Sequence, residues 1–341
     1  MIERILLAVI AFLLLFAGAA QLLPREAHVE RSIEIARPVG TVFTLLNRFE
    51  TFPAWSPWSV RDPNVSYTIS GPEAGPGARV EWTGEPRLVG AGWMEISDSQ
   101  PNSIIRYTLE MDGNRQASGA FQIQRMAGGA RVTWTFGTDL VKGQGLYGGL
   151  MSRYFGLLFD RWIGPDFERG LDGLKRYAEA LPAGDFSGLK VNRIDAIPLD
   201  VLYVAMSGGA GVSDKLALAY HDISAFMAAH GLERSGPPIS LKRDGGQGRY
   251  RYEAAIPVSR VETPEEEHVR WGRTPRGPAL RVIHRGAYEQ LDMTYQKLAA
   301  WMAAHGFRQG DASWEQYISD PTTTDAENRI THIYVRLAPK G

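Results

Sequence analysis

The sequence has 341 residues, contains no cysteine, and carries 37 basic against 38 acidic side chains. This length predicts two domains and an additional segment, because a domain usually spans ~100 to 200 residues. The absence of thiols excludes disulfide bonds, a cysteine nucleophile and cysteine-ligated metal clusters. A net charge of −1 lacks the basic excess with which nucleic-acid binders neutralise phosphates, so no nucleic-acid partner is expected.

The first segment predicts a membrane anchor. Residues 5–23 carry no charge and are rich in Leu, Ile, Ala and Phe, and a helix over this stretch rises about 28 Å, close to the hydrocarbon thickness of a bilayer. We expect residues 1–27 to form an uncleaved single-pass anchor, in the inner membrane of a bacterium. A cleaved signal peptide is the alternative, because Ala17, Gly18 and Ala19 form a small-x-small pattern. Nearly balanced flanking arginines leave the side of the membrane open.

Residues 28–180 predict a first domain of the α+β class. Alternating apolar and polar residues predict a strand over 29–35, and Pro38 suits the start of a short helix. Aromatic and leucine residues then recur at helical spacing from Phe159 to Tyr177, which predicts one long closing helix. Between them, short apolar runs separated by turn residues predict strands over 65–69, 79–82, 92–96, 104–109, 120–123 and 131–136.

Two phrases in this domain, together with the order of its elements, resemble a known family. They are Glu34-Ile35-Ala36-Arg37-Pro38-Val39 followed by Val42-Phe43, and Trp55-Ser56-Pro57-Trp58. Both are similar to phrases of the START-like polyketide cyclase/dehydrase and lipid-transport superfamily (SRPBCC), whose fold is called a helix grip. The resemblance implies a cavity between sheet and helix that holds an apolar ligand. Candidate lining residues are Trp55, Trp58, Trp82 and Trp93, with ordinary core packing as the alternative.

A linker over 181–190 and a second domain over 191–341 are predicted next, and the second domain contains a repeat. The stretch 216–233 aligns without gaps with 291–308, and the identical positions include Tyr220/Tyr295 and His230/His305. Each copy predicts a helix that follows a strand (200–207 and 279–284) and precedes two strands (239–241 with 250–258, and 314–318 with 330–337). Two strand-helix-strand-strand units of this kind commonly pair about a pseudo-twofold axis with a cleft between them.

Three phrases of the second domain are similar to the GyrI-like, AraC-type effector-binding family, which binds small molecules and occurs in multidrug-sensing regulators. They are Tyr252-Glu253-Ala254-Ala255-Ile256-Pro257-Val258, His284-Arg285-Gly286-Ala287-Tyr288-Glu289, and Trp314-Glu315-Gln316-Tyr317. In that family the Glu of the last phrase is the acid of the ligand pocket, which implies this role for Glu315. The aromatic residues of these phrases are candidate pocket walls, with core packing as the alternative: Tyr250, Tyr252, Tyr288 and Tyr317.

Alternation along the strand places Glu315 and Tyr317 on one face, and Trp314 with Ile318 on the other. A carboxylate beside aromatic rings suits a lipophilic cation, and it could also act as a general base or nucleophile. From the sequence alone, a solvent-facing glutamate on an edge strand is the alternative. Trp271, in a loop rich in Arg and Gly, is either a lid over the pocket or a surface residue.

No metal and no cofactor are expected. His230 and His305 each precede a glycine at a helix end, where the helix dipole and the glycine cap explain them without a metal. The leading hypothesis is a membrane-tethered protein that binds amphipathic small molecules as a sensor, scavenger or carrier. The alternatives are a hydrolase of strained or electrophilic compounds such as cyclopropanoids, acting through Glu315 and a tyrosine, and a purely structural interaction module. The sequence leaves catalysis, ligand identity and oligomeric state open.

Overall fold

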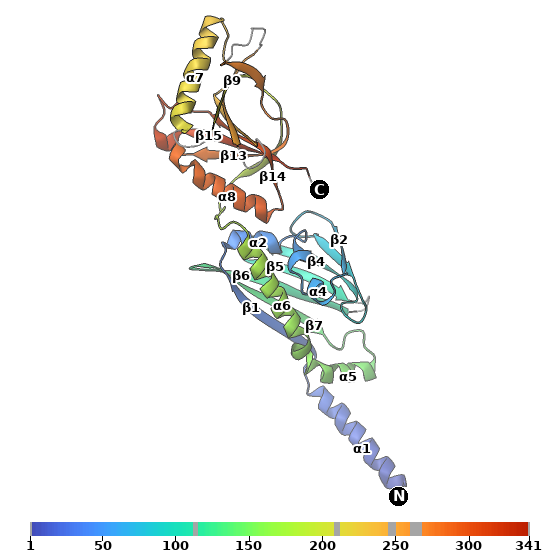
Figure 1. Cartoon of the computed structure of the whole chain (residues 1–341). Helices are drawn as coiled ribbons and strands as arrows, with labels where there is room; N and C mark the ends of the chain where they lie inside the picture. The colour runs from blue at the N-terminus through green and yellow to red at the C-terminus, as the bar shows by residue number, and fades with distance from the viewer. Residues whose placement is uncertain (1, 112–114, 208–211, 245–249, 260–267, 340–341) are drawn as a thin grey trace. The chain divides into compact units, whose positions relative to one another are not determined.

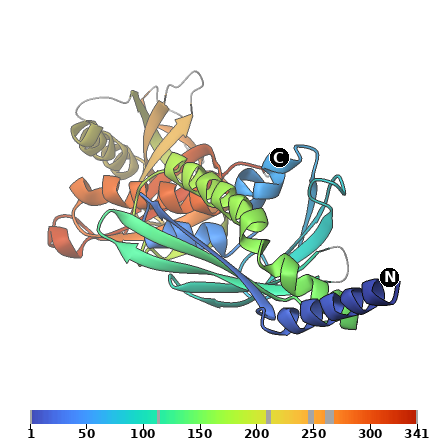
Figure 2. The same cartoon turned by 90° about the horizontal axis from the view of Figure 1, so that it is seen from below.

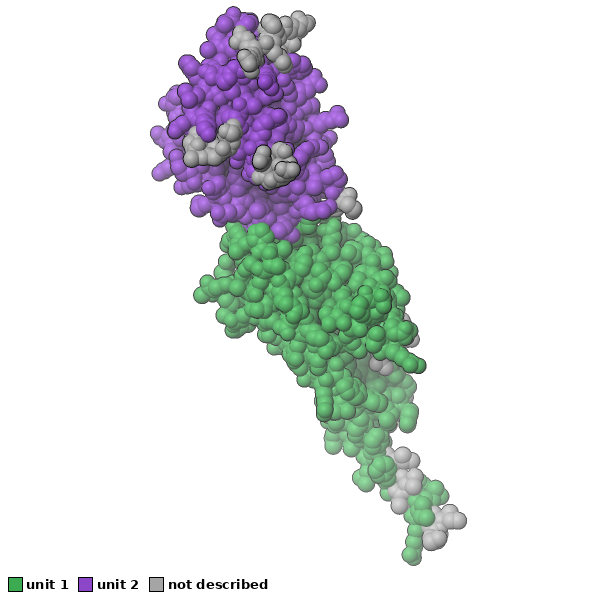
Figure 3. All heavy atoms as spheres, in the orientation of Figure 1, with its two compact units in different colours: residues 1–185, 304–306 green, residues 186–303, 307–341 purple. Residues whose placement is uncertain are grey.

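The computed structural model describes residues 2–111, 115–207, 212–244, 250–259 and 268–339. The chain divides into two compact units, each built on one antiparallel sheet (Figure 3). Unit 1 comprises residues 1–185 with 304–306, and unit 2 comprises residues 186–303 with 307–341. The fold is therefore of the mixed α+β class, as predicted.

The chain begins with the apolar helix α1 (Ile2–Gln21). It is the helix of the described chain that is long and apolar enough to cross a membrane, with a mean hydropathy of 2.1 over Arg4–Gln21, of which 7% is buried. A signal sequence near an N-terminus would pass the same test.

Unit 1 contains a seven-stranded antiparallel sheet in the order β1-β7-β6-β5-β4-β3-β2. The long helix α6 (Phe159–Ala180) lies along one face of this sheet and contacts β1 most extensively (Figures 1 and 2). The strands are β1 (Glu26–Ile35), β2 (Ser66–Ser70), β3 (Arg79–Thr83), β4 (Ala91–Gln100), β5 (Ile104–Met111), β6 (Arg115–Met126) and β7 (Gly129–Asp139). The short helices are α2 (Val39–Leu46), α3 (Phe52–Trp55), α4 (Pro57–Arg61) and α5 (Leu146–Gly156).

Close approach of α6 to the rest of unit 1 depends on two glycines. A Cβ atom at Gly170 would lie 2.6 Å from the Trp134 ring, and one at Gly173 would lie 2.6 Å from the backbone oxygen of Trp55. Both contacts are shorter than side chains tolerate, so only glycine allows the helix this near. The interior that it covers is largely aromatic. Within it the Trp134 ring packs between the rings of Phe121 and Phe167.

Unit 2 contains an eight-stranded antiparallel sheet in the order β12-β9-β11-β10-β14-β15-β13-β8. The strands are β8 (Val191–Ala196), β9 (Asp200–Ser207), β10 (Ile239–Asp244), β11 (Tyr250–Pro257), β12 (Arg270–Arg273), β13 (Gly277–Arg285), β14 (Gln309–Tyr317) and β15 (Ile330–Leu337). The helices are α7 (Val212–Ala229) and α8 (Leu291–Ala304), with short 3₁₀ turns at Tyr288–Gln290 and Ala326–Asn328. Read inward from one edge of the sheet, the strands follow the order β9-β11-β10, and read inward from the other edge they follow β13-β15-β14. The two strand-helix-strand-strand segments therefore meet where β10 pairs with β14.

The two faces of the unit 2 sheet differ. Both helices lie on one face, which we call the helix face (Figure 1). There α7 covers a cluster around Val204, Ile223 and Ala254, and α8 covers a cluster around Val282, Leu298 and Ile333. The opposite face, which we call the open face, has its own smaller cluster of Val201, Ile239, Leu241, Ala255, Ala279 and Trp314.

Most elements expected from the sequence are present with bounds shifted by a few residues. The expectations did not include α3, α4, α5, β8 or β12. The strands β8 and β12 form the two edges of the unit 2 sheet and are short, as edge strands often are.

Candidate functional site

Glu315 lies on the helix face of β14, at the centre of the unit 2 sheet. Successive strand pairings place Val204, Ala254, Ser240, Glu315, Ile333 and Val282 side by side in one row across the sheet. Cross-strand partners share a face, so this row joins the cluster under α7 to the cluster under α8. Glu315 is the one charged member of the row, and the next two members on the α7 side, Ser240 and Ala254, are small.

Two phenol groups bind the carboxylate of Glu315. The Tyr295 hydroxyl, from α8, donates to Oε1 at 2.9 Å, and the Tyr317 hydroxyl, from β14 itself, donates to Oε2 at 2.7 Å. Hydrogen bonds to a charged acceptor are stronger than neutral ones, so the two phenols hold the carboxylate in a defined position. We call Glu315, Tyr295, Tyr317, Tyr220 and Tyr288 the tyrosine–glutamate cluster.

The remaining two tyrosines of the cluster surround the carboxylate less directly. The Tyr288 ring packs against the Tyr317 ring with their centroids 5.3 Å apart. The Tyr220 hydroxyl, from α7, is buried and has no hydrogen-bond partner among the residues that the structure describes. A buried hydroxyl without a partner costs about 1–3 kcal/mol, which makes it unusual in a folded protein.

The electrostatics of the cluster keep its phenols protonated. Burial raises the pKa of Tyr220, Tyr295 and Tyr317 above the ordinary value, and the negative charge of Glu315 raises the pKa of each further. Burial also raises the pKa of Tyr288, although the Arg329 guanidinium opposes this shift. At neutral pH the cluster therefore presents hydroxyl donors and aromatic faces around one carboxylate. A carboxylate has about four acceptor positions, so it can accept further contacts beyond the two phenols.

Three of the residues proposed from the sequence come together here, and two do not. Glu315, Tyr317 and Tyr288 belong to the cluster, and Tyr252 lies close enough to influence the pKa of Tyr295. Tyr250 is 49% exposed, with the Lys242 ammonium 3.9 Å from the centre of its ring. Trp271 is 44% exposed and lies on the edge strand β12. The alternative of a solvent-facing glutamate on an edge strand is wrong, because β14 is a central strand and Glu315 is half-buried.

Two residues of the cluster, Tyr220 and Tyr295, were not among the proposed site residues. Both are identical positions of the internal repeat, and that identity was the available signal. Their place in the site depends on how each helix is rotated against the sheet, which the alignment does not give.

The four tryptophans proposed for the first domain have different environments. Trp58 and Trp82 stack with centroids 4.0 Å apart, and Trp55 packs edge-on against Trp134. Trp93 is partly exposed beneath the guanidinium of Arg79. The indole N–H groups of Trp55 and Trp82 are buried and have no acceptor within the described part of the chain. None of the four lines the surface cavity of about 350 Å³ in unit 1, which is formed by His28, Ser97, Arg106, Tyr107, Thr108, Ser118, Gly119, Ala120, Thr135, Phe136 and Gly137.

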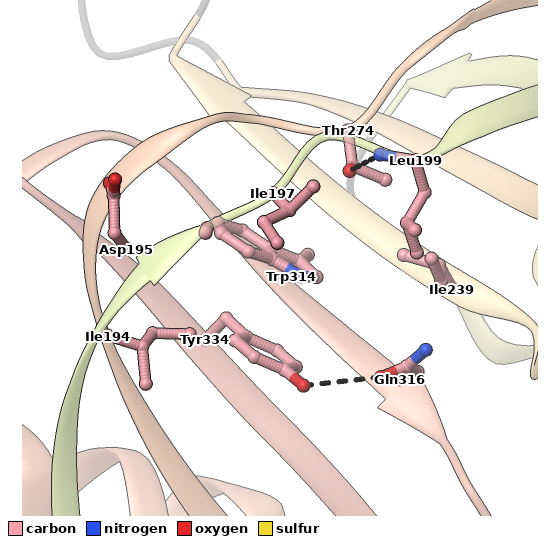
Figure 4. A pocket seen from close by; sticks show the side chains of 10 residues that line it. Ile194, Asp195, Ile197, Leu199, Ile239, Thr274, Trp314, Gln316 and Tyr334 are labelled. Atoms are coloured by element: carbon pink, nitrogen blue, oxygen red, sulfur yellow. Dashed lines mark hydrogen bonds between the residues drawn. The ribbon is translucent and has the colours of Figure 1, made fainter.

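A second cavity lies on the open face of unit 2 and measures about 300 Å³ (Figure 4). Trp314 and Tyr334 stack in it with centroids 4.9 Å apart, and the Tyr334 hydroxyl donates to Gln316 Oε1 at 3.3 Å. Trp314 and Gln316 flank Glu315 on β14, so alternation turns them away from the carboxylate. This cavity is therefore separate from the tyrosine–glutamate cluster.

The repeated histidines, His230 and His305, each precede a glycine of positive φ at a helix end, 63° at Gly231 and 71° at Gly306. His230 follows the last turn of α7, where its Nδ1 lies 2.9 Å from the Phe226 carbonyl oxygen, and its ring packs on the Phe226 ring. Within the described ranges, no group of three or more His, Asp or Glu side chains is arranged to hold a metal ion.

Comparisons with known families agree with this architecture. The model of the family described as polyketide cyclase / dehydrase and lipid transport matches residues 26–179, and that of the GyrI-like small molecule binding domain matches residues 239–338. The chain is thus similar to these two families in two successive parts of its length. This confirms the two-domain fusion expected from the sequence and supports a small molecule as the ligand of the GyrI-like domain. No curated protein matches the chain.

Solved structures are similar at low identity. The EcmrR C-terminal domain shares 19% identity, with 44% of this chain and 98% of that chain covered and a TM-score of 0.40. A hydrolase encoded by lin2189 from Listeria innocua shares 15% identity, with 44% and 92% covered and a TM-score of 0.33. Ara h 8.0201 shares 12% identity, with 45% and 97% covered and a TM-score of 0.33.

Proposed function

We propose that this protein is a membrane-tethered binding protein for amphipathic small molecules, above all lipophilic cations, and acts as a sensor, scavenger or carrier. The observation that carries the proposal is the tyrosine–glutamate cluster, in which one carboxylate is held by two phenols next to a third phenol without a partner. A cation in contact with Glu315 would gain the attraction of the carboxylate and of the surrounding aromatic faces.

The energetics of the unliganded cluster favour this function. Removing a carboxylate from water costs several kcal/mol unless an opposite charge compensates it. Tyr295 and Tyr317 donate their hydrogen bonds from neutral hydroxyl groups, so these bonds compensate only part of the cost of burying the charge. A bound cation would supply the missing positive charge, and a polar atom of the ligand could accept the hydrogen bond that Tyr220 leaves unmade.

Two further parts of the proposal concern architecture. We propose that α1 stays attached as a single-pass anchor, which its length and hydropathy support. We also propose that the two halves of unit 2 are copies related by a pseudo-twofold axis. The mirrored strand order supports this relation, and the offset that aligns Tyr220 with Tyr295 also aligns Ser240 with Glu315, its direct cross-strand partner.

The decisive experiment compares cation binding by the full chain and by Glu315→Gln, in detergent micelles, with tetraphenylphosphonium as the probe and neutral triphenylphosphine oxide as its control. We expect the parent chain to gain thermal stability with the cation, and Glu315→Gln to lose affinity about 10- to 100-fold, or ~1.4–2.8 kcal/mol. The matched control is Glu233→Gln, which removes an exposed carboxylate of the same unit and should bind as the parent does. Equal affinities in the parent and Glu315→Gln would exclude Glu315 as the binding acid.

Hydrolysis of strained or electrophilic compounds is the second candidate. The observation in its favour is that Tyr295 and Tyr317 place phenol protons within hydrogen-bond distance of the Glu315 carboxylate, so a proton donor and a nucleophile or base coexist in one site. The parent should then convert a cyclopropane-bearing substrate, and Tyr295→Phe should reduce the rate about 10²- to 10⁴-fold. Stoichiometric binding of such a compound without product would contradict this candidate.

A further inference from the structure

A patch of exposed apolar side chains marks the corner between α5 and α6 in unit 1. Tyr147 and Phe155 lie on α5, Leu157 and Leu158 lie in the corner, and Trp162 lies in the first turns of α6. These side chains are 77%, 54%, 61%, 45% and 52% exposed, respectively. The Phe155 and Trp162 rings lie 6.0 Å apart, so the exposed apolar surface continues from α5 into α6 across the corner. We call these five residues the corner patch.

The corner patch lies on the side of α5 and the corner opposite to the side that packs against the protein. Gly149 and Gly156 face the segment that follows β7, where a Cβ atom would lie 3.0 Å from Val141 and 2.4 Å from Leu140, respectively. The patch is therefore additional to the core of unit 1. Large apolar side chains that gather on a surface in this way usually mark an interaction site.

The same corner holds the end of the apolar helix α1. The Arg153 guanidinium donates to the backbone oxygen of Leu23 at 2.8 Å, and the Tyr154 hydroxyl donates to the backbone oxygen of Phe16 at 2.7 Å. The Tyr154 and Phe16 rings stack with centroids 4.2 Å apart. The C-terminal end of α1 thus lies beside α5, the helix that carries part of the patch (Figure 1).

The charges around the patch favour a lipid headgroup layer. Lys142, Arg153 and Arg161 lie in this region. The acidic groups nearby are already paired, Asp160 with Arg31 at 2.9 Å and Asp139 with Arg25 at 2.9 Å. Tryptophan and tyrosine beside basic residues are the side chains that concentrate where a membrane protein meets the headgroups.

We propose that the corner patch inserts into the headgroup layer of the same bilayer that α1 crosses, so that unit 1 rests on the membrane surface. This inference depends on the anchor role of α1 in the proposed function. Two elements would then hold unit 1 at the lipid, the spanning helix and the corner, instead of a single tether. A helix that lies in the interface typically buries its apolar face about 5–10 Å below the surface, which side chains of this size can reach.

The absence of cysteine in the natural sequence allows a direct test. Single cysteines at Leu158 and Phe155 in the full chain would carry a nitroxide spin label, after reconstitution into vesicles of phosphatidylcholine and phosphatidylglycerol. The control is Leu88→Cys, a similarly exposed leucine of unit 1 outside the patch, and Leu14→Cys on α1 reports on the anchor. Collision rates with oxygen, which concentrates in lipid, and with a water-soluble nickel chelate give the depth of each label.

We expect the labels at Leu158 and Phe155 to collide preferentially with oxygen, and the label at Leu88 to collide preferentially with the nickel chelate. A lipid depth at Leu14 combined with aqueous labels at both patch positions would overturn the proposal and leave the anchor intact. An aqueous Leu14 label would contradict the anchor, and the patch proposal with it. Immobile patch labels that neither reagent reaches would mean that protein covers the patch, which also overturns the proposal.

Discussion

The interiors of the two units each bury tyrosine hydroxyls, but they satisfy them differently. In unit 1 the Tyr107 hydroxyl donates to the Thr135 carbonyl oxygen at 3.0 Å and accepts from Trp134 Nε1 at 2.7 Å. In unit 2 the Tyr220 hydroxyl has no partner among the described residues, and two further phenols point at a carboxylate. In unit 1 the groups are neutral and the hydroxyl both donates and accepts a hydrogen bond. In unit 2 the site contains a carboxylate, and one hydroxyl makes no hydrogen bond with the described residues.

The difference indicates where each unit could accept a ligand and of what kind. The buried groups without partners near the aromatic interior of unit 1 include the indole N–H groups of Trp55 and Trp82, which are neutral donors. They suit a water molecule or a neutral acceptor. The corresponding region of unit 2 has Glu315, so it suits a cation. The buried polar groups of the two units thus offer different chemistry to a ligand.

The largest expected effect on stability comes from disrupting the hydrogen-bonded Tyr107 site in unit 1. In Gly119→Ala the new Cβ atom would lie 2.2 Å from the Thr135 oxygen and 2.3 Å from the Tyr107 hydroxyl, so the strands or the phenol must move. We expect unit 1 to lose about 3 kcal/mol of stability, measured by urea unfolding with hydrogen exchange to resolve the two units. Gly128→Ala, where no atom lies within 4 Å of the new Cβ, should stay within about 1 kcal/mol of the parent. Equal stabilities of the two variants would refute the steric argument.

Tyr107→Phe removes only the hydroxyl from the same arrangement. It leaves the buried Trp134 N–H and the Thr135 carbonyl oxygen without this partner, so we expect a loss of about 2 kcal/mol in unit 1. Urea unfolding provides the measurement. A loss below about 0.5 kcal/mol would mean that the hydroxyl of Tyr107 contributes no more than an unpaired one.

Tyr220→Phe is the matching change in unit 2, and we expect it to leave stability unchanged or slightly higher. The hydroxyl that it removes is buried and without a partner among the described residues, so its loss breaks no hydrogen bond and removes a desolvation cost. The same variant should bind a lipophilic cation with altered affinity if the ligand uses this hydroxyl. A stability loss comparable to that of Tyr107→Phe would show that Tyr220 has a partner in solution, and the contrast between the units would fail.

The smallest effect concerns alkaline titration. Burial raises the pKa of Tyr107, whereas the pKa values of Tyr295 and Tyr317 are raised by burial and by the charge of Glu315. Phenols with a raised folded-state pKa stabilise the fold below their unfolded pKa of about 10, and this stability is lost as the pH rises through the folded-state values. Glu315→Gln should therefore lower the pH at which the unit 2 tyrosines ionise, followed by ultraviolet absorbance, and leave Tyr107 unchanged. Identical titration curves would contradict the role of the Glu315 charge.

Much of the architecture could be predicted from the sequence because it depends on local patterns. Alternation predicted the central strands of both sheets, and the repeated stretches predicted the two helices α7 and α8. The helix α5 was not predicted, since its outward residues are apolar and do not give the amphipathic pattern of a helix on a soluble protein.

The candidate site could be predicted only in part. Glu315 and Tyr317 share a strand, so alternation alone places them on one face. Tyr295 and Tyr220 reach the carboxylate region from two helices, and no local pattern shows how those helices are rotated. The exposure of Tyr250 and Trp271 likewise depends on which strands become edges of the sheet.

The pairing of Ser240 with Glu315 has a consequence for how a ligand is oriented. These two residues face each other on adjacent strands. A glutamate in place of Ser240 would bring two carboxylates into contact, and their repulsion would keep one of them protonated. With serine there, the middle of the row carries a single negative charge, which is bonded by Tyr295 of α8 and not by Tyr220 of α7. The two helices therefore offer a ligand different groups, a phenol already bonded to the carboxylate on α8 and an unpaired phenol on α7.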